Sequence, residues 1–300
     1  YVSDEAKATL SAAAAPPIRL ITLSADGRKV EVGNEVVLFR HEKTFYHKPG
    51  LFVFGENLVK GRRVFLVASP PRLGKSSLLR QLPHHLPPEL LTARLDLREE
   101  NPRALDWLLW RIAAALATQA GPRLGLNLPA PDWFAFEGQT GQLVAGFWPT
   151  LKAHLGGRSL VLLLDDVHCL AEAPDGLLDK LMDSLAAWRD REEKVAFLLT
   201  CDDGAQEDLV RRYPQLLAGS LTYSLGSLSS EEATRLITWP VDGVLTYDYG
   251  VARRIIEITS GQPYYLHLLC FQVYNRCAAA GWVNLHDIDL VVGDLVGREI

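Results

Sequence analysis

The fold of this chain of 300 residues is decided by the stretch Ser69-Pro70-Pro71-Arg72-Leu73-Gly74-Lys75-Ser76, which follows a short apolar run over residues 63–68. The apolar run predicts a buried strand, and residues 76–82 predict a helix that begins directly after the loop. A strand, a glycine-containing turn and a helix that opens with Gly-Lys-Ser form the setting of a phosphate-binding loop. Its backbone N–H groups and the helix N-terminus face a polyanion. We therefore expect this stretch to bind phosphate groups.

Each residue at the end of this loop has its own expected role. Gly74 lets the chain pass close to the phosphates, and Lys75 directs its cation at the β and γ phosphates. Ser76 offers a hydroxyl to Mg²⁺, and Ser77 supports the first turn of the helix. The residues expected to line the nucleotide are Ser69, Pro70, Pro71, Arg72, Leu73, Gly74, Lys75, Ser76 and Ser77.

The beginning of the loop departs from the pattern G-x-x-x-x-G-K-[ST]. Ser69 replaces the first glycine, and Pro70 and Pro71 supply no N–H donors. Two outcomes stay open: the loop binds phosphate more weakly, or it folds normally with Ser69 in a permissive conformation. A Gly-Lys-Ser that occurs by chance in a turn is the alternative, and the strand and helix around it argue against that.

A second motif lies about ninety residues downstream. Residues 160–164 are all aliphatic and predict a buried strand, which ends in Asp165 and Asp166. Open α/β sheets bind ligands at the carboxyl ends of their strands. We expect Asp165 to bind Mg²⁺, usually through water, and Asp166 to polarise the attacking water. Two aspartates can also mark a plain turn, but together with the upstream loop they predict a nucleoside triphosphate site.

Strand and helix patterns alternate from residue 49 to residue 226, which predicts a parallel sheet covered by helices. Helical patterns dominate residues 227–300, where residues 229–232 form a capping box. Residues 1–48 differ, with strand candidates over 18–23, 30–32 and 36–39. We therefore predict an α/β P-loop domain over 49–226, a small helical lid domain over 227–300, and a separate N-terminal segment over 1–48.

The composition argues against several classes of protein. A net charge of -5 argues against a protein that coats nucleic acid nonspecifically, and a local basic patch stays open as a way to contact it. No apolar run is long enough to span a membrane. The four cysteines lack the spacing of a zinc site or a disulfide framework, so we expect free, buried thiols. These features and the absence of a signal-peptide pattern favour a cytoplasmic setting.

From residue 52 onward the chain resembles the STAND branch of the AAA-like P-loop ATPases, including the archaeal-type ATPases. Four stretches carry the resemblance: residues 52–56 (FVFGE), the two phosphate-site motifs, residues 225–233 (LGSLSSEEA) and residues 261–263 (GQP). The resemblance implies ATP and Mg²⁺ as ligands, Pro263 near the adenine, and Thr200 as a polar sensor of the γ phosphate. The family commonly has Glu where Asp166 stands, so we expect slow hydrolysis.

The sequence gives less support for a role of other polar residues in the nucleotide site. The arginine-finger or sensor candidates are Arg211, Arg212, Arg253 and Arg254, although most surface arginines are merely solvated. Asp96 and Arg98 follow a predicted strand, where they either line the site or cap a loop.

The first 47 residues resemble a piece of the large subunit of the corrinoid iron–sulfur protein of acetyl-CoA synthesis. The resemblance is carried by residues 1–7, 16–19 and 37–47. The cluster cysteines are absent and so short a segment cannot close an eight-stranded barrel, so we expect neither corrinoid nor cluster binding. We interpret His41 and His47 as solvated or packed side chains.

These observations support three hypotheses about function. The first is an ATP-dependent molecular switch, a P-loop ATPase whose partners are nucleotide and, by resemblance, proteins or further copies of itself. The second is a nucleotide-binding scaffold with little hydrolysis, which Ser69, the two prolines and Asp166 motivate. The third is a remnant component of corrinoid methyl transfer. The sequence does not settle ATP against GTP, although the chain shows no guanine-reading N-K-x-D motif and the family resemblance favours ATP.

Overall fold

A computed structural model describes residues 62–297 apart from residues 101, 103, 126 and 127, together with the backbone of two short strands near the N-terminus. These strands, β1 (Leu20–Leu23) and β2 (Val30–Gly33), pair antiparallel as the hairpin expected there. The strand expected over residues 36–39, and His41 and His47, lie outside the described residues. The longer described part divides into two compact units, residues 62–225 and residues 226–297, each with its own core.

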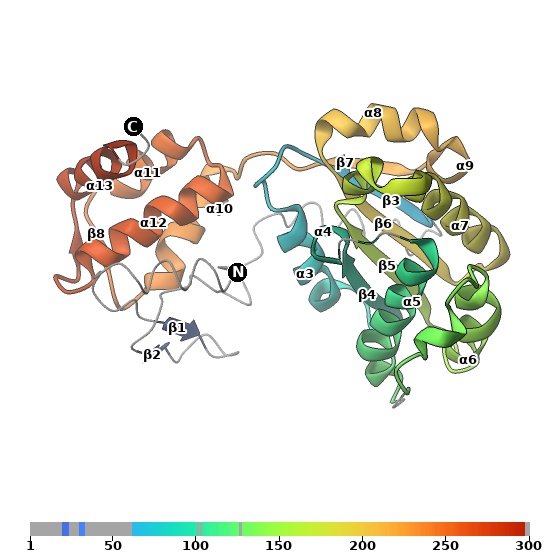
Figure 1. The fold of residues 1–300 in the computed structure, drawn as a ribbon. Coiled ribbons are helices and arrows are strands. Elements are labelled where there is room, and N and C mark those ends of the chain that lie inside the picture. Colours follow the sequence, from blue (N-terminus) through green and yellow to red (C-terminus); the bar gives the residue numbers. More distant parts are fainter. Residues whose placement is uncertain are drawn as a thin grey trace. The chain divides into compact units, whose positions relative to one another are not determined.

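The first unit is built on a five-stranded, fully parallel sheet (Figure 1). Its strands are β3 (Val64–Ala68), β4 (Leu90–Asp96), β5 (Ser159–Asp165), β6 (Val195–Cys201) and β7 (Leu221–Ser224). In space they follow the order β4-β5-β6-β3-β7. β6 is therefore inserted between β3 and β5, the two strands that carry the motifs.

Apolar side chains explain the burial of the central strands. Every residue of β3 and of β6 is buried, and β5 is buried from its second residue onward. Such continuous apolar runs are typical of parallel strands that are covered on both faces. Aromatic rings fill the core beside the sheet, where Trp188 lies 5.3 Å from Trp148 and 5.7 Å from Phe197 between ring centroids.

Seven α-helices connect or flank these strands in the described part of this unit. They are α3 (Lys75–His85), α4 (Leu97–Glu100), α5 (Leu105–Ala115), α6 (Trp148–Lys152), α7 (Leu177–Arg191), α8 (Asp203–Arg212) and α9 (Pro214–Leu217). Helix α5 ends at Ala115, and the chain continues as a π-helical turn, Leu116–Ala120. A second π-helical turn, Leu143–Phe147, precedes α6, where Pro149 has no N–H for a regular i→i−4 bond.

The second unit is mainly helical. Its helices are α10 (Ser230–Thr238), α11 (Val251–Thr259), α12 (Pro263–Cys277) and α13 (Leu285–Gly297), joined by a short parallel pair, β8 (Thr246–Tyr247) and β9 (Trp282–Val283). The predicted capping box is confirmed, since Ser229 and Glu232 exchange side-chain and backbone hydrogen bonds at the start of α10. Within the described part of the chain, no helix has the length and apolar character needed to cross a membrane.

Two stretches that support the family resemblance meet inside this unit. Gly261 has φ 68°, a left-handed conformation that favours glycine. A Cβ at this position would lie 2.6 Å from the carbonyl oxygen of Leu228, whose own N–H donates to the Gly261 carbonyl at 2.9 Å. Only a residue without a side chain fits here, so packing against the start of α10 requires the glycine before α12.

Candidate phosphate-binding site

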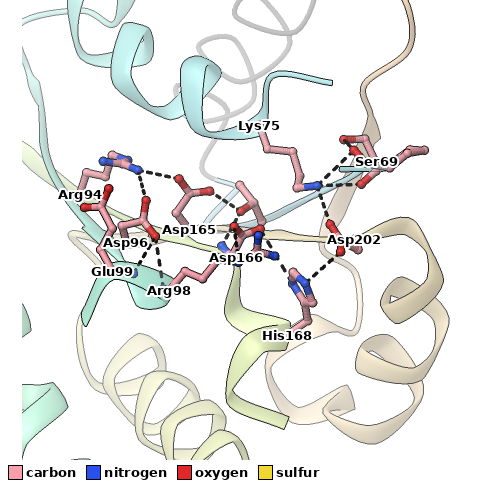
Figure 2. A network of polar contacts seen from close by, with 12 residues as sticks. Ser69, Lys75, Arg94, Asp96, Arg98, Glu99, Asp165, Asp166, His168 and Asp202 are labelled. Carbon is pink, nitrogen blue, oxygen red and sulfur yellow. Dashed lines mark hydrogen bonds and ion pairs between the residues drawn. The ribbon is translucent and has the colours of Figure 1, made fainter. Parts of the chain in front are cut away.

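The two motifs meet at one edge of the sheet (Figure 2). Lys75 opens α3 directly after β3, and Asp165 ends β5. Because all five strands are parallel, their carboxyl ends lie at the same edge. β6 fills the gap between these two strands. Its residue Thr200 contacts both aspartates, and Asp202, directly after the strand, contacts Lys75.

The loop after β3 turns through two left-handed residues. These are Arg72 with φ 68° and Gly74 with φ 99°, the second of which is the N-cap of α3. Ser69 is not among the residues with positive φ, so its backbone does not need the freedom of glycine. Its N–H donates to the Cys201 carbonyl at 3.4 Å, and this bond continues the pairing of β3 with β6. The loop thus follows the strand without the first glycine of the motif.

Lys75 is buried and points back into the loop. Its Nζ donates to the carbonyls of Ser69 at 2.8 Å and Pro70 at 3.4 Å. It also forms an ion pair of 2.7 Å with Asp202, the first residue after β6. Burial raises the pKa of Asp202, but the hydrogen bond and the charge of Lys75 outweigh this effect, so the net pKa lies below its ordinary value. An internal anion therefore balances the lysine that was predicted to face phosphates.

Asp165 is fully buried and held from both sides. One carboxylate oxygen accepts a hydrogen bond from Thr200 Oγ1 at 2.7 Å, and the other pairs with Arg94 Nη2 at 2.7 Å. The same Arg94 nitrogen also contacts Asp96, whose position in β4 is opposite Asp165 in the strand register. Burial alone would lower the pKa of the Arg94 guanidinium, but Asp165 and Asp96 raise it above its ordinary value. These contacts fix the orientation of the Asp165 side chain.

Asp166 has a different environment from its neighbour. Its backbone is left-handed with φ 57°, and its N–H donates to Thr200 Oγ1 at 2.7 Å. One carboxylate oxygen lies 3.4 Å from Arg98 Nε, whereas the other is buried without a hydrogen-bond partner among the described residues. Burial and the charge of Asp165 raise the pKa of Asp166, and Arg98, Lys75 and His168 offset only part of the increase. A carboxylate of this kind is suited to accept a proton.

Three residues at this edge were not predicted from the sequence. They are Arg94, His168 and Asp202, and two of them touch Lys75 or Asp165 directly. His168 lies in the 3₁₀ helix Val167–Glu172, and its Nε2 is 3.1 Å from Asp202. The signal for Asp202 was available, because a polar residue directly after a buried strand lies at the ligand-binding edge of a parallel sheet.

The other predicted residues lie at this edge of the sheet, on the surface or in the helical unit. Asp96 accepts hydrogen bonds from the N–H groups of Arg98 and Glu99, which is the capping role, and Arg98 also lies beside Asp166. The four arginine candidates form surface ion pairs: Arg211 with Asp208, Arg212 with Asp179, Arg253 with Glu257 and Arg254 with Asp289. Pro263 is the first residue of α12 in the helical unit.

The remaining residues of the predicted phosphate site are at the start of α3. Ser76 is half-buried and Ser77 is exposed. Each oxygen of Asp165 already accepts one hydrogen bond, but an ionised carboxylate offers about four acceptor sites. Asp165 therefore has capacity left for the water shell that Mg²⁺ usually keeps, and the residues fit a water-mediated ion better than direct coordination by Asp165.

The cysteines are free, as expected from their spacing. Three are buried, and Cys169 is half-buried beside Asp166. Burial raises the pKa of Cys201 to about 12 and that of Cys169 to about 11. These thiols are therefore protonated near neutral pH and are poor nucleophiles.

Comparison with solved structures places this fold among P-loop ATPases. The Walker-type ATPase PABY2304 of Pyrococcus abyssi matches over 85% of this chain and 74% of its own, with a TM-score of 0.64 and 15% identity. Domain III of the replication initiation protein DnaA of Thermotoga maritima matches over 84% of this chain and 95% of its own, with a TM-score of 0.53 and 15% identity. At such identities the similarity establishes the fold. The chain has a parallel-sheet P-loop NTPase fold followed by a helical region.

Sequence comparisons match only a short part of the chain. No family model matches the chain. The large subunit of the corrinoid/iron–sulfur protein of Moorella thermoacetica is 51% identical over 53 residues, which is 18% of this chain and 12% of that protein. The gamma subunit of the acetyl-CoA decarbonylase/synthase complex of Methanopyrus kandleri is 38% identical over 52 residues, 17% of this chain and 11% of its own. The chain thus spans about one eighth of the curated relatives that it matches.

Proposed function

We propose that this protein binds ATP with Mg²⁺ at the edge formed by the loop of residues 69–76 and the end of β5, and hydrolyses it slowly as a nucleotide-dependent switch. The observation that carries the proposal is the meeting of Lys75, Thr200 and the two aspartates through β6. A buried lysine, a helix N-terminus and a buried carboxylate at one sheet edge form a site for a polyphosphate with a divalent ion.

Each residue has a defined task in this proposal. The N–H groups at the start of α3 and the Lys75 ammonium bind the phosphates, and Ser76 and Asp165 hold the hydrated Mg²⁺. Mg²⁺, when bound, neutralises phosphate charge. Asp166 lies beside this position and faces the water that attacks the γ phosphate. Thr200 fixes both aspartates, because its hydroxyl contacts Asp165 Oδ1 and the Asp166 N–H at 2.7 Å each.

Replacement of the lysine tests this assignment. Lys75→Ala removes a charge-assisted phosphate contact worth about 1.5–3 kcal/mol, so ATP binding is expected to weaken roughly 10- to 150-fold. Calorimetric titration with and without Mg²⁺ measures the change. Lys152→Ala is the matched control, because α6 precedes the opposite end of β5 and its lysine is exposed. An unchanged affinity in Lys75→Ala would exclude the site, provided the wild type binds.

A hydrolysis-poor scaffold is the second candidate. It is favoured by the internal pairing of Lys75 with Asp202, which nucleotide must displace, and by an aspartate at position 166, one methylene shorter than glutamate. Steady-state phosphate release distinguishes the two. Turnover that stays undetectable while Mg²⁺·ATP binds tightly supports the scaffold, and slow turnover that Lys75→Ala abolishes supports the switch.

A further inference from the structure

His168 lies against Asp202 beside the phosphate site, and the proposed function gives this histidine no role (Figure 2). The His168 ring is mostly buried, with 18% of its side chain exposed. Its Nε2 lies 3.1 Å from Asp202 Oδ2, and the other oxygen of Asp202 binds Lys75 at 2.7 Å. The ring is therefore tied through one aspartate to the lysine that is expected to hold the phosphates.

This pair determines which ring nitrogen carries the proton. An ionised carboxylate attracts an N–H group and repels a nitrogen lone pair, so the ring hydrogen lies on the nitrogen that faces Asp202. The pKa of Asp202 lies below its ordinary value, chiefly because the hydrogen bond and charge of Lys75 outweigh the effect of burial, so its carboxylate is ionised near neutral pH. Neutral His168 consequently has its hydrogen on Nε2 and a free lone pair on Nδ1.

That lone pair faces a second acceptor. His168 Nδ1 and Asp166 Oδ1 lie 4.0 Å apart, and both are buried without a hydrogen-bond partner among the described residues. Two acceptors at this separation do not bond to each other. One water oxygen at about 2.8 Å from each, a normal hydrogen-bond length, spans the separation. Such a water donates both of its hydrogens, one to each acceptor, and keeps its own lone pairs free.

We propose that His168 is a catalytic residue of hydrolysis that holds the attacking water together with Asp166 and takes its proton on Nδ1, while Asp202 positions the ring. This inference rests on the proposed function. In the step, the water oxygen bonds to the γ phosphorus and the bond from that phosphorus to the β–γ bridging oxygen breaks. The water proton moves to Nδ1, ADP and phosphate leave, and the imidazolium returns its proton to solvent.

The proposal also explains how an aspartate can serve at position 166. A glutamate would reach one methylene farther from the strand end. Here the 3₁₀ helix Val167–Glu172 begins at the left-handed Asp166 and places an imidazole beside the shorter carboxylate. General-base assistance by a positioned side chain is typically worth 10²- to 10⁴-fold in rate. Loss of His168 is therefore expected to affect turnover far more than binding.

The first test separates binding from chemistry. His168→Asn keeps an acceptor near the Nδ1 position but cannot take a proton at neutral pH. We expect its affinity for Mg²⁺·ATP, measured by calorimetry, to stay within about twofold of wild type, while single-turnover phosphate release falls at least 10²-fold. His168→Ala is expected to behave alike and to regain part of its rate with added imidazole. The matched control is His154→Ala, an exposed histidine before the opposite end of β5.

The second test needs no nucleotide. ¹⁵N NMR of histidine-labelled wild type should show His168 with its proton on Nε2, and the signal is assigned by its loss in His168→Asn. Asp202→Ala should weaken this tautomer preference. A proton on Nδ1 in the neutral wild-type ring would overturn the proposal, because Nδ1 would then have no lone pair for the water.

The outcomes distinguish this inference from the proposed function. A wild type that does not bind Mg²⁺·ATP contradicts both. A wild type that binds and hydrolyses ATP, with His168 variants that hydrolyse at the same rate, overturns the role of His168 and leaves the proposed function standing. Binding without any hydrolysis overturns the role of His168 and leaves the nucleotide site. Lost turnover with retained affinity, imidazole rescue and the Nε2 tautomer supports it.

Discussion

Asp165 and Asp166 are adjacent in sequence but contribute to stability with opposite signs. Asp166 has a raised pKa, caused first by burial and then by the charge of Asp165, so the folded state holds a proton there more tightly than the unfolded chain does. Its contribution to the free energy of unfolding therefore falls as pH rises from the unfolded value, about 3.9, through the folded one. Asp166→Asn is expected to stabilise the protein by roughly 1 kcal/mol at pH 8. The gain should vanish near pH 3, where both states are protonated.

Asp165→Asn is the matched comparison for this prediction. It weakens charge-assisted hydrogen bonds from Arg94 and Thr200 at a fully buried position, so a loss of roughly 2 kcal/mol is expected. Urea unfolding, followed by the fluorescence of the buried Trp148 and Trp188, measures both variants. If Asp166→Asn lowered the free energy of unfolding as much as Asp165→Asn does, the Asp166 carboxylate would stabilise the folded state, which contradicts the prediction.

Site residues that belong to a motif of consecutive residues could be predicted from the sequence. Those whose role depends on a contact with a distant residue could not. Lys75 and Asp165 could be found because each belongs to a motif written in consecutive residues beside an apolar run. His168 could not, because its role depends on Asp202, which lies 34 positions later and reaches it only across the end of β6. Arg94 was missed because a charged residue inside a strand reads as exposed, whereas parallel pairing places it beside Asp165.

At the scale of elements, the insertion of β6 between β3 and β5 makes Thr200 the link between the two motifs. Its buried hydroxyl donates to Asp165 Oδ1 and accepts from the Asp166 N–H. Thr200→Val keeps the shape but leaves both groups without this partner, so we expect a loss of roughly 1–3 kcal/mol in the free energy of unfolding. ATP turnover should fall at least tenfold, because both carboxylates lose their orientation.

Thr200→Ser is the control for this substitution, since it restores the hydroxyl. Phosphate release and urea unfolding are measured on both variants. Turnover in Thr200→Val at the wild-type rate would show that the hydroxyl supports only the fold.

Alternation of strands and helices predicted the parallel sheet, but the spatial order of the strands is set by how their buried faces pack together. The pairing of Thr200 with both aspartates follows from that order.

The short polar helix α8 was not predicted. α8 buries only Leu209, so it has little of the apolar periodicity that indicates a helix. For the π-helical turn Leu143–Phe147, Pro149 gives a physical reason for the departure from regular α-helix. Local chemistry did identify the start of α10, because its capping box lies in four consecutive residues.

At the scale of the whole molecule, the described chain consists of two compact units with separate hydrophobic cores. A switch requires nucleotide to have different affinities for different arrangements of these units. Labels at Glu207→Cys in α8 and His286→Cys in α13, both exposed positions, report the separation of the units by energy transfer. Burial raises the pKa of Cys169 to about 11, and the other native thiols are buried, so the introduced cysteines react first.

We expect Mg²⁺·ATP to change the energy-transfer efficiency of this doubly labelled protein, and the same labels on Lys75→Ala to show no change at equal ATP concentration. The physical reason is that nucleotide bound at the strand ends changes the equilibrium between arrangements of the two units in only two ways. Either it contacts the helical unit itself, or it displaces a group that contacts the helical unit. Calorimetry on the labelled protein confirms that ATP is bound. Bound ATP with an unchanged efficiency would contradict the switch and leave a nucleotide-binding scaffold, because a ligand with equal affinity for every arrangement shifts none of them.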